Sequence, residues 1–142
     1  MGIDPGKTGG IALHHYDVNE ESIAYKMPQT EKDISDLIKK HSQIISKAYI
    51  EKVNSMPNQG VKSVWTFSGN YHGLRMALLC HGISFESVPP IKWQTALSCR
   101  TKGDKNITKA KAQEMFPGLK ITHAIADALL IAEYGRRDVL RT

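Results

Sequence analysis

Three acidic residues, far apart along the chain, have surroundings that suit metal binding. Asp4 ends an apolar segment just before a Pro-Gly turn, and Glu51 follows the apolar residues 48–50. Asp127 lies within residues 124–132, which are apolar nearly all round on a helix, so burying its carboxylate is costly without a partner. Carboxylate oxygens suit Mg²⁺ or Mn²⁺. Two such ions can activate water and stabilise the leaving oxygen in phosphodiester hydrolysis.

Each of these residues also has a plainer interpretation on its own. Asp4 fits a simple turn-starting residue, and Glu51 fits a charge at the edge of a sheet. His123 precedes Asp127 by four residues, which places both side chains on one helical face, roughly 5–6 Å apart. A structural His–Asp contact and a histidine ligand both fit that pair. The metal-site hypothesis therefore rests on the three acids and the histidine occurring together, and not on any one of them.

The positive charge of the chain is concentrated in one segment. The protein has 19 Lys and Arg residues against 14 Asp and Glu, which gives a net charge of +5. Residues 92–120 hold seven of the basic residues and two of the acidic ones, so the remainder of the chain is balanced. Such a segment suits a polyanionic partner, most simply nucleic acid. On charge alone, a solvated lysine-rich surface fits equally well.

Short strands and helices must position these residues. Strands are expected over residues 1–4, 10–16, 22–27, 48–53 and 83–88. Helices are expected over about 30–46, 61–81, 92–98, 107–116 and 123–134 or a little beyond, with turn-rich loops at 54–60 and 100–106. Consecutive strands predict hairpins and helix-linked strands predict parallel crossovers, so we expect a mixed five-stranded α/β sheet with helices on both faces. If the first and fourth strands are neighbours, Asp4 and Glu51 face each other at one end of the sheet, about 4.8 Å apart at the backbone.

Length and composition limit the class of protein. The 142 residues fit one domain, and 41% hydrophobic with 23% charged residues excludes disordered and collagen-like chains. No apolar stretch approaches the ~18 residues of a spanning helix, and no secretory signal is recognisable, so we expect no membrane partner and a cytoplasmic location. Cys80 and Cys99 have no metal-ligand spacing and are expected to be reduced.

Taken in order, the motifs resemble the RuvC family of Holliday junction resolvases, which are nucleases of the ribonuclease H-like superfamily. The resemblance is carried by GIDPG at 2–6, IEKV at 50–53 and ADAL at 126–129, and it extends from Gly2 to about Gly135. The stretch 56–61, and residues 88–90 with Trp93, look like the shorter phage-type and organellar relatives. The motifs are specific as an ordered set, whereas the first alone is not.

The resemblance implies one ribonuclease H-fold nuclease domain over residues 1–142. It implies a crossover junction endodeoxyribonuclease of DNA recombination and repair, which nicks two opposing strands of a four-way junction symmetrically. Asp4, Glu51 and Asp127 would be the metal-binding carboxylates, for Mg²⁺ or Mn²⁺ with two ions per site. Relatives often have a fourth carboxylate three or four residues before the last Asp, and here Ala124 and His123 stand there. His123 is therefore expected to serve as a catalytic residue and metal ligand. The location expected from the family widens to an organellar matrix or a phage-infected cell.

The DNA contacts are expected from the basic segment and from one loop. The GDK stretch at 103–105 resembles the family's basic loop, so Lys105 is expected to contact phosphate and to be important for cleavage. In some relatives an aromatic residue soon after the catalytic Glu contacts junction bases, and none stands near Glu51 here. The other expected DNA-binding residues are Lys102, Lys109, Lys111, Met56, Asn58 and Gln59.

Two-fold symmetric nicking needs two active sites, and one domain of this size carries one. An isologous homodimer supplies the second. The predicted helix at 61–81 has apolar residues on more than one side, namely Val64, Trp65, Phe67, Leu74 and Leu78. We expect one apolar side to pack on the sheet and a second to form the dimer contact.

Other functions fit parts of the same pattern. One is a four-way-junction binding protein whose altered fourth ligand leaves it weak or inactive, and another is a ribonuclease H-like nuclease acting on other branched nucleic acids. An actin- or sugar-kinase-like ATPase also carries Asp-x-Gly-x-x-x-Gly, as at residues 4–10. Those enzymes need two large lobes and a second phosphate loop, which a chain of 142 residues without such a loop does not provide.

Overall fold

A five-stranded mixed sheet forms the centre of the computed structural model, which describes residues 1–17, 19–54 and 57–142. The strand order is β3-β2-β1-β4-β5. The first three strands pair antiparallel, whereas β1 pairs with β4 and β4 with β5 in parallel. The strands are β1 Gly2–Asp4, β2 Gly10–Leu13, β3 Ile23–Lys26, β4 Ala48–Glu51 and β5 Phe85–Val88. The expected mixed sheet is confirmed.

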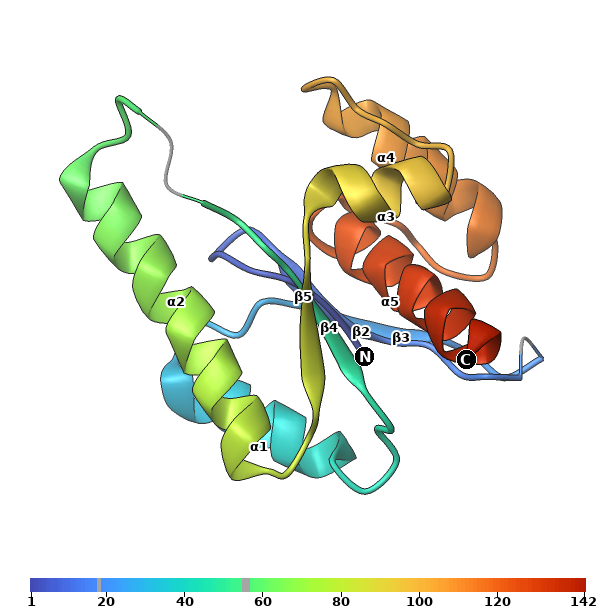
Figure 1. Cartoon of the computed structure of the whole chain (residues 1–142), viewed down its shortest axis with the longest axis horizontal. Helices are drawn as coiled ribbons and strands as arrows, with labels where there is room; N and C mark the ends of the chain where they lie inside the picture. Colours follow the sequence, from blue (N-terminus) through green and yellow to red (C-terminus); the bar gives the residue numbers. More distant parts are fainter. Residues whose placement is uncertain (18, 55–56) are drawn as a thin grey trace.

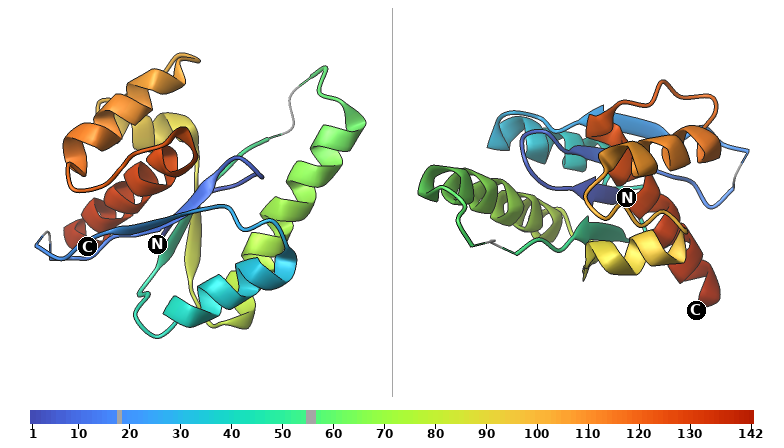
Figure 2. Two further views of the ribbon diagram at one scale, coloured as in Figure 1. Left: turned by 180° about the vertical axis from the view of Figure 1, so that it is seen from behind. Right: turned by 90° about the horizontal axis from the view of Figure 1, so that it is seen from above.

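Five helices in the part of the chain that the structure describes cover the two faces of this sheet. They are α1 Glu31–His41, α2 Val61–Cys80, α3 Pro90–Ala96, α4 Lys105–Met115 and α5 His123–Arg141. Helices α1 and α2 lie on one face, and α3, α4 and α5 lie on the other (Figures 1 and 2). Among the described residues, no helix has the length and apolar character needed to cross a membrane.

The strands alternate their side chains between two apolar cores. Ile3 and Ile50 are fully buried in the core beneath α1 and α2. Tyr49 is buried in the other core, together with α5. Because successive side chains of a strand point to opposite faces, Asp4 and Glu51 project toward the face that α5 covers. The alternation of side chains along β1 and β4 therefore turns Asp4 and Glu51 toward α5, the helix that carries Asp127.

Helix α5 lies almost directly on the backbone of β1. A Cβ atom at Gly2 would overlap the backbone of Ala128 and Ala132, which are one helical turn apart. Gly10 of β2 stands in the same relation to the carbonyl of Ala124, one turn earlier. Small residues at every fourth position of α5 thus meet glycines of the two strands, and the helix axis is set at short range from the sheet.

Four helices differ in their boundaries from those that the sequence predicts. Helix α1 ends at His41 and not at residue 46, and α3 spans Pro90–Ala96 and not 92–98. Helix α4 begins at Lys105 and not at residue 107, because the Asp104 carboxylate caps it by accepting from the Asn106 N–H at 3.0 Å. Lys105 is therefore the first helical residue and does not belong to the loop. Helix α5 continues to Arg141, well past Tyr134.

The extension of α5 is supported by ion pairs along one side of the helix. Arg136 and Arg137 follow Glu133 by three and four residues. Their Nε atoms donate to the Glu133 carboxylate at 2.8 and 2.6 Å. Glu133 is only 5% exposed, so these bonds are shielded from solvent. His14 of the loop after β2 reaches the same carboxylate at 2.8 Å, which ties the hairpin to α5.

The packing of α5 leads to a paired prediction for two helical glycines. A Cβ at Gly135 would overlap the ring of Tyr49, whereas a Cβ at Gly69 of α2 meets nothing within 4 Å. We expect Gly135→Ala to lower the free energy of unfolding by about 1–3 kcal/mol through overpacking. Gly69→Ala should raise it by about 0.5–1 kcal/mol, because alanine has the higher helix propensity. Urea unfolding of both variants checks this, and equal effects of one sign would contradict the described packing.

Candidate functional site

The first two acids are brought together by the pairing of β1 with β4. Gly2 is opposite Tyr49 and Ile3 is opposite Ile50 in the parallel register. Asp4 and Glu51 are the next residues on these two strands, so both stand at the carboxyl end of the sheet centre. The carboxyl ends of parallel strands are where ligands gather in α/β proteins. The neighbouring strands that the sequence analysis required are present.

The electrostatics of Asp4 connect it to the other charged residues of the site. Burial raises the pKa of Asp4 well above its ordinary value. The nearby carboxylates of Glu51 and Asp127 raise it further, and the Lys105 ammonium opposes them. Because such effects need short separations in a shielded environment, strands β1 and β4, helix α5 and the start of α4 all bring charge to one place.

The pKa of Glu51 is also raised, and its carboxylate accepts a short hydrogen bond. Burial raises its pKa to about 7, with the indole N–H of Trp93 opposing, Asp127 adding to the rise and Lys105 opposing. The Trp93 Nε1 donates to Glu51 Oε2 at 2.7 Å. At neutral pH the metal-free carboxyl is thus divided between its neutral and ionised forms, which is unusual for a glutamate.

Asp127 carries the clearest sign of a missing partner. Burial raises its pKa, and hydrogen bonding by Thr108 and the charges of Lys105 and His123 oppose the rise. Its Oδ1 is buried, and among the described residues it has no hydrogen-bond partner. An unpaired buried carboxylate oxygen is costly, and a hard cation would relieve it.

The four expected ligands fit a hard cation chemically but do not form a closed cage. In residues 1–17, 19–54 and 57–142, no three His, Cys, Asp or Glu side chains are arranged so that they could hold a metal ion. His123, at the exposed start of α5, interacts with Asp127 by its charge. The acids are therefore electrostatic neighbours, and a bound cation would have to draw their oxygens closer.

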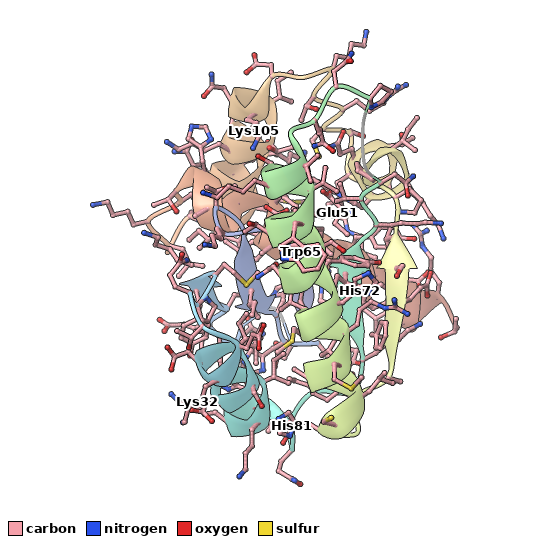
Figure 3. All side chains as sticks on the ribbon, turned by 90° about the vertical axis from the view of Figure 1, so that its left-hand side faces the viewer. Lys32, Glu51, Trp65, His72, His81 and Lys105 are labelled. Atoms are coloured by element: carbon pink, nitrogen blue, oxygen red, sulfur yellow. The ribbon has the colours of Figure 1, made fainter. Side chains whose placement is uncertain are left out.

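A cleft of about 610 Å³ opens beside two of the acids, and Asp127 is not among its described lining residues. Asp4 and Glu51 line it, together with three lysines from separate elements. Lys7 comes from the turn after β1, Lys62 from the start of α2 and Lys105 from the start of α4. Figure 3 shows Glu51 and Lys105 toward the same end of the molecule. The three lysines form the rim of the cleft and can hold a polyanion there. The rim lies next to the acidic floor, which consists of Asp4, Glu51 and Asp127.

Lys7 and Lys62 were not among the residues that the sequence analysis selected. Lys7 follows Asp4 by three residues in the same turn, so its proximity to the acid could have been noticed. No local sequence pattern links Lys62 to the site, because it lies outside the basic segment 92–120. It lines the cleft only because the packing of α2 brings the first turn of this helix there. The basic lining is therefore shared between both sides of the cleft.

The turn that carries Asp4 is held from α2. Gly6 adopts φ +104°, a conformation that side-chain-bearing residues rarely take. Its N–H donates to Asn70 Oδ1 at 2.7 Å, and the ring of Phe67 lies directly against it. Asn70 was also absent from the sequence-based selection, since nothing local links it to a turn 64 residues away.

The expected DNA-binding residues fall on two sides of the cleft. Lys102, with φ +47°, and Lys109 belong to the α4 side, where Lys111 pairs with Glu114 at 3.6 Å. Exposed Asn58 and Gln59 lie in the segment leading to α2, and Met56 lies outside the described residues. Figure 1 places this segment and α4 on opposite sides of the strand ends.

Comparison with solved structures identifies the fold. A Thermus thermophilus RuvC structure matches with a TM-score of 0.66 and 18% identity, over 99% of this chain and 95% of that one. T. thermophilus RuvC in complex with a Holliday junction substrate matches with a TM-score of 0.69 and 16% identity, over 98% and 94%. No protein-family model and no curated protein matches the sequence. At this identity the likeness is one of fold, and the expected ribonuclease H-like fold is confirmed. The phage-type or organellar subtype stays a prediction.

The raised pKa of Glu51 predicts a pH-dependent effect of Glu51→Gln on stability. Between about pH 4.5 and pH 7 the folded chain retains a proton that the unfolded chain has lost, so the contribution of Glu51 to stability falls as the pH rises. Glutamine has no proton to lose. The free energy of unfolding of the variant should therefore rise relative to that of the wild type across this pH window, by at most about 3 kcal/mol at pH 8.

Urea unfolding in the presence of a chelator, at about pH 5 and about pH 8, measures this difference. Glu114→Gln removes an exposed carboxylate and serves as the control for the loss of one negative charge as such. A Glu51→Gln difference that is the same at both pH values would contradict the assigned environment of Glu51.

Proposed function

We propose that this chain is a metal-dependent endonuclease that resolves four-way DNA junctions. The observation that carries the proposal is the placement of Asp4 and Glu51 at the adjacent carboxyl ends of two paired strands, where the charge of Asp127 raises the pKa of both. The lysine-lined cleft at Asp4 and Glu51 gives a phosphate backbone a place to lie. The near-complete overlap with a RuvC fold that has been solved with a junction substrate supports the choice of DNA substrate.

In this proposal the acidic floor holds the cofactor. Asp4, Glu51 and Asp127 bind Mg²⁺ or Mn²⁺ through their oxygens, with His123 at the edge of the site. Two ions, when bound, would supply Lewis-acid activation of the attacking water and stabilisation of the leaving oxygen. The orphaned Oδ1 of Asp127 and the raised pKa of Glu51 support this assignment, since both are relieved by positive charge.

The lysines of the rim orient the substrate. Lys105, at the start of α4, lies close enough to all three acids to perturb each of them, so it is suited to the scissile phosphate. Lys7 and Lys62, on the other side of the cleft, are suited to neighbouring phosphates of the same strand. Additional contacts to the DNA backbone would come from Lys102, Lys109 and Lys111 on the α4 side and from Asn58 and Gln59 on the other. Met56, which lies outside the described residues, stays a predicted contact.

A homodimer would provide the second active site. Leu74 and Leu78 of α2 are fully buried in the sheet core, whereas Val61 and Trp65 are 87% and 81% exposed. The exposed apolar residues of α2 recur at helical spacing and are Val61, Trp65, Met76 and Leu79. One isologous contact through this outward side would bury them and relate two clefts by a two-fold axis, as symmetric nicking requires.

A second candidate function is a junction-binding protein with little or no nuclease activity. It is favoured by the lack, among the described residues, of a ready-made metal cage and by the histidine at the fourth ligand position. The two functions differ in the effect of His123→Asp. If binding is the function, the wild type leaves junctions intact and the substitution creates cleavage. If the histidine serves the nuclease, the substitution lowers an existing rate.

The proposed activity is tested by incubating a synthetic four-way junction with the protein and Mg²⁺ or Mn²⁺. We expect paired nicks in two opposing strands that leave 5′-phosphate and 3′-hydroxyl ends. Asp4→Asn, Glu51→Gln and Asp127→Asn should each lower the rate by more than about 100-fold, because each removes a proposed ligand oxygen charge. Junction binding in a chelator should persist. Intact junctions under conditions of demonstrated binding would overturn the nuclease proposal.

The assignment of Lys62 to the cleft rim leads to a separate prediction. Lys62→Ala should weaken junction binding and reduce the slope of log affinity against log salt by about 1, because one phosphate contact is lost. Lys32→Ala is the matched control, since Lys32 is an exposed lysine at the far end of the molecule from Glu51 (Figure 3). Titrations at several salt concentrations measure both slopes. Equal slopes for Lys62→Ala and the wild type would contradict the role of Lys62.

A further inference from the structure

One proposed cation ligand is held by a buried tryptophan. The Trp93 Nε1–H donates to Oε2 of Glu51 at 2.7 Å. An indole has one hydrogen-bond donor and no acceptor, so this bond uses its whole polar capacity. Trp93 has no exposed surface, and the bond to a carboxylate within the protein is short and shielded from water. Its energy is therefore greater than that of a typical surface contact.

The chain between β5 and α3 directs the indole to this position. Strand β5 ends at Val88, whose carbonyl accepts from the Lys52 N–H at 2.8 Å and so continues the β4–β5 pairing past Glu51. Pro90 then begins α3 as its first residue, where the missing N–H costs nothing. Trp93 follows within the first turn of α3 and reaches back to the end of β4.

The rest of the Trp93 environment is apolar and closely packed. Val88 and Leu97 belong to the same buried cluster, and both are at most 2% exposed. The indole cannot change its direction without disturbing this core, so the N–H is fixed in space. A glutamate at the end of a strand otherwise has three rotatable side-chain bonds. The contact removes much of that freedom.

We infer that Trp93 is a positioning residue, which holds Glu51 by Oε2 and leaves Oε1 as the oxygen available to a cation in the cleft. This inference rests on the proposed function, because it takes Glu51 to be a ligand. Outer partners of metal-binding groups orient those groups, and their loss typically weakens metal affinity or activity by about 10–100-fold. Trp93 does not touch the substrate in this assignment and acts through Glu51 alone.

The test is Mn²⁺ binding to the DNA-free protein, followed by titration calorimetry or by the electron paramagnetic resonance of free Mn²⁺. Trp93→Phe retains a flat aromatic ring and removes the N–H. We expect Mn²⁺ to bind about 10–100-fold more weakly, while junction binding in a chelator stays within about two-fold of the wild type. In nicking assays the half-saturating Mn²⁺ concentration should rise, and the rate at saturating Mn²⁺ should approach the wild-type value.

Leu97→Ala is the matched control for loss of packing. Leu97 lies in the same buried cluster and has no polar group to offer Glu51. We expect this variant to lose stability and keep its Mn²⁺ affinity. If Trp93→Phe binds Mn²⁺ as the wild type does, or if Leu97→Ala weakens Mn²⁺ binding equally, the inference is overturned.

Replacement of Trp93 by 3-benzothienylalanine keeps the size and shape of the indole and exchanges the N–H for sulfur. This second variant separates the hydrogen bond from the packing if Trp93→Phe does not fold, and the same loss of Mn²⁺ affinity is expected. Glu51→Gln distinguishes a failure of the proposed metal site from a failure of the role of Trp93. If Glu51→Gln leaves Mn²⁺ binding unchanged, the proposed metal site fails, whereas a loss with Glu51→Gln but not with the Trp93 variants refutes only the role of Trp93.

Discussion

The close contact between α5 and β1 is the constraint on which the site depends. Gly2 leaves room for the helix backbone at Ala128 and Ala132, so that no side chain separates the two elements. Asp127 is the residue before Ala128, and Asp4 is two residues after Gly2 on the same face of the sheet. Because the helix touches the strand, the two carboxylates come within electrostatic range. A bulkier residue at position 2 would move the third acid away.

The same contact makes the acidic floor energetically costly. Burial is the largest cause of the raised pKa at Asp4, at Glu51 and at Asp127. The protein offsets part of this cost through the charge of Lys105, the hydrogen bond from Trp93 to Glu51, and the effects of Thr108 and His123 on Asp127. A fold selected for stability alone would place other residues here. Because burial disfavours the ionised carboxylates, a bound cation would relieve this cost, which is the physical basis of the proposed metal site.

Helix α2 links the site to the outer surface of the molecule. Asn70 fixes the turn that follows Asp4, and Lys62 faces the cleft from the first turn of the helix. Leu74 and Leu78 pack into the sheet, and Trp65 stands outside. One helix thus contributes a core face, a contact to the turn that follows Asp4 and an exposed apolar side. A partner bound to that exposed side would be mechanically connected to the turn that carries Asp4.

Local patterns in the sequence determined the elements, their order and the three acids, because caps, periodicity and burial of a lone charge act within a few residues. Thr30 accepts from the Asp33 N–H at 3.1 Å and so caps the helix expected from about residue 30, a contact between near neighbours in the sequence. Asp104 also caps its helix, which begins at Lys105, two residues before the start that the sequence predicts. Only the tertiary structure decided that Lys62, Asn70 and Trp93 reach the site. Each meets its partner through strand order and helix packing, and such long-range contacts leave no mark in the neighbouring residues.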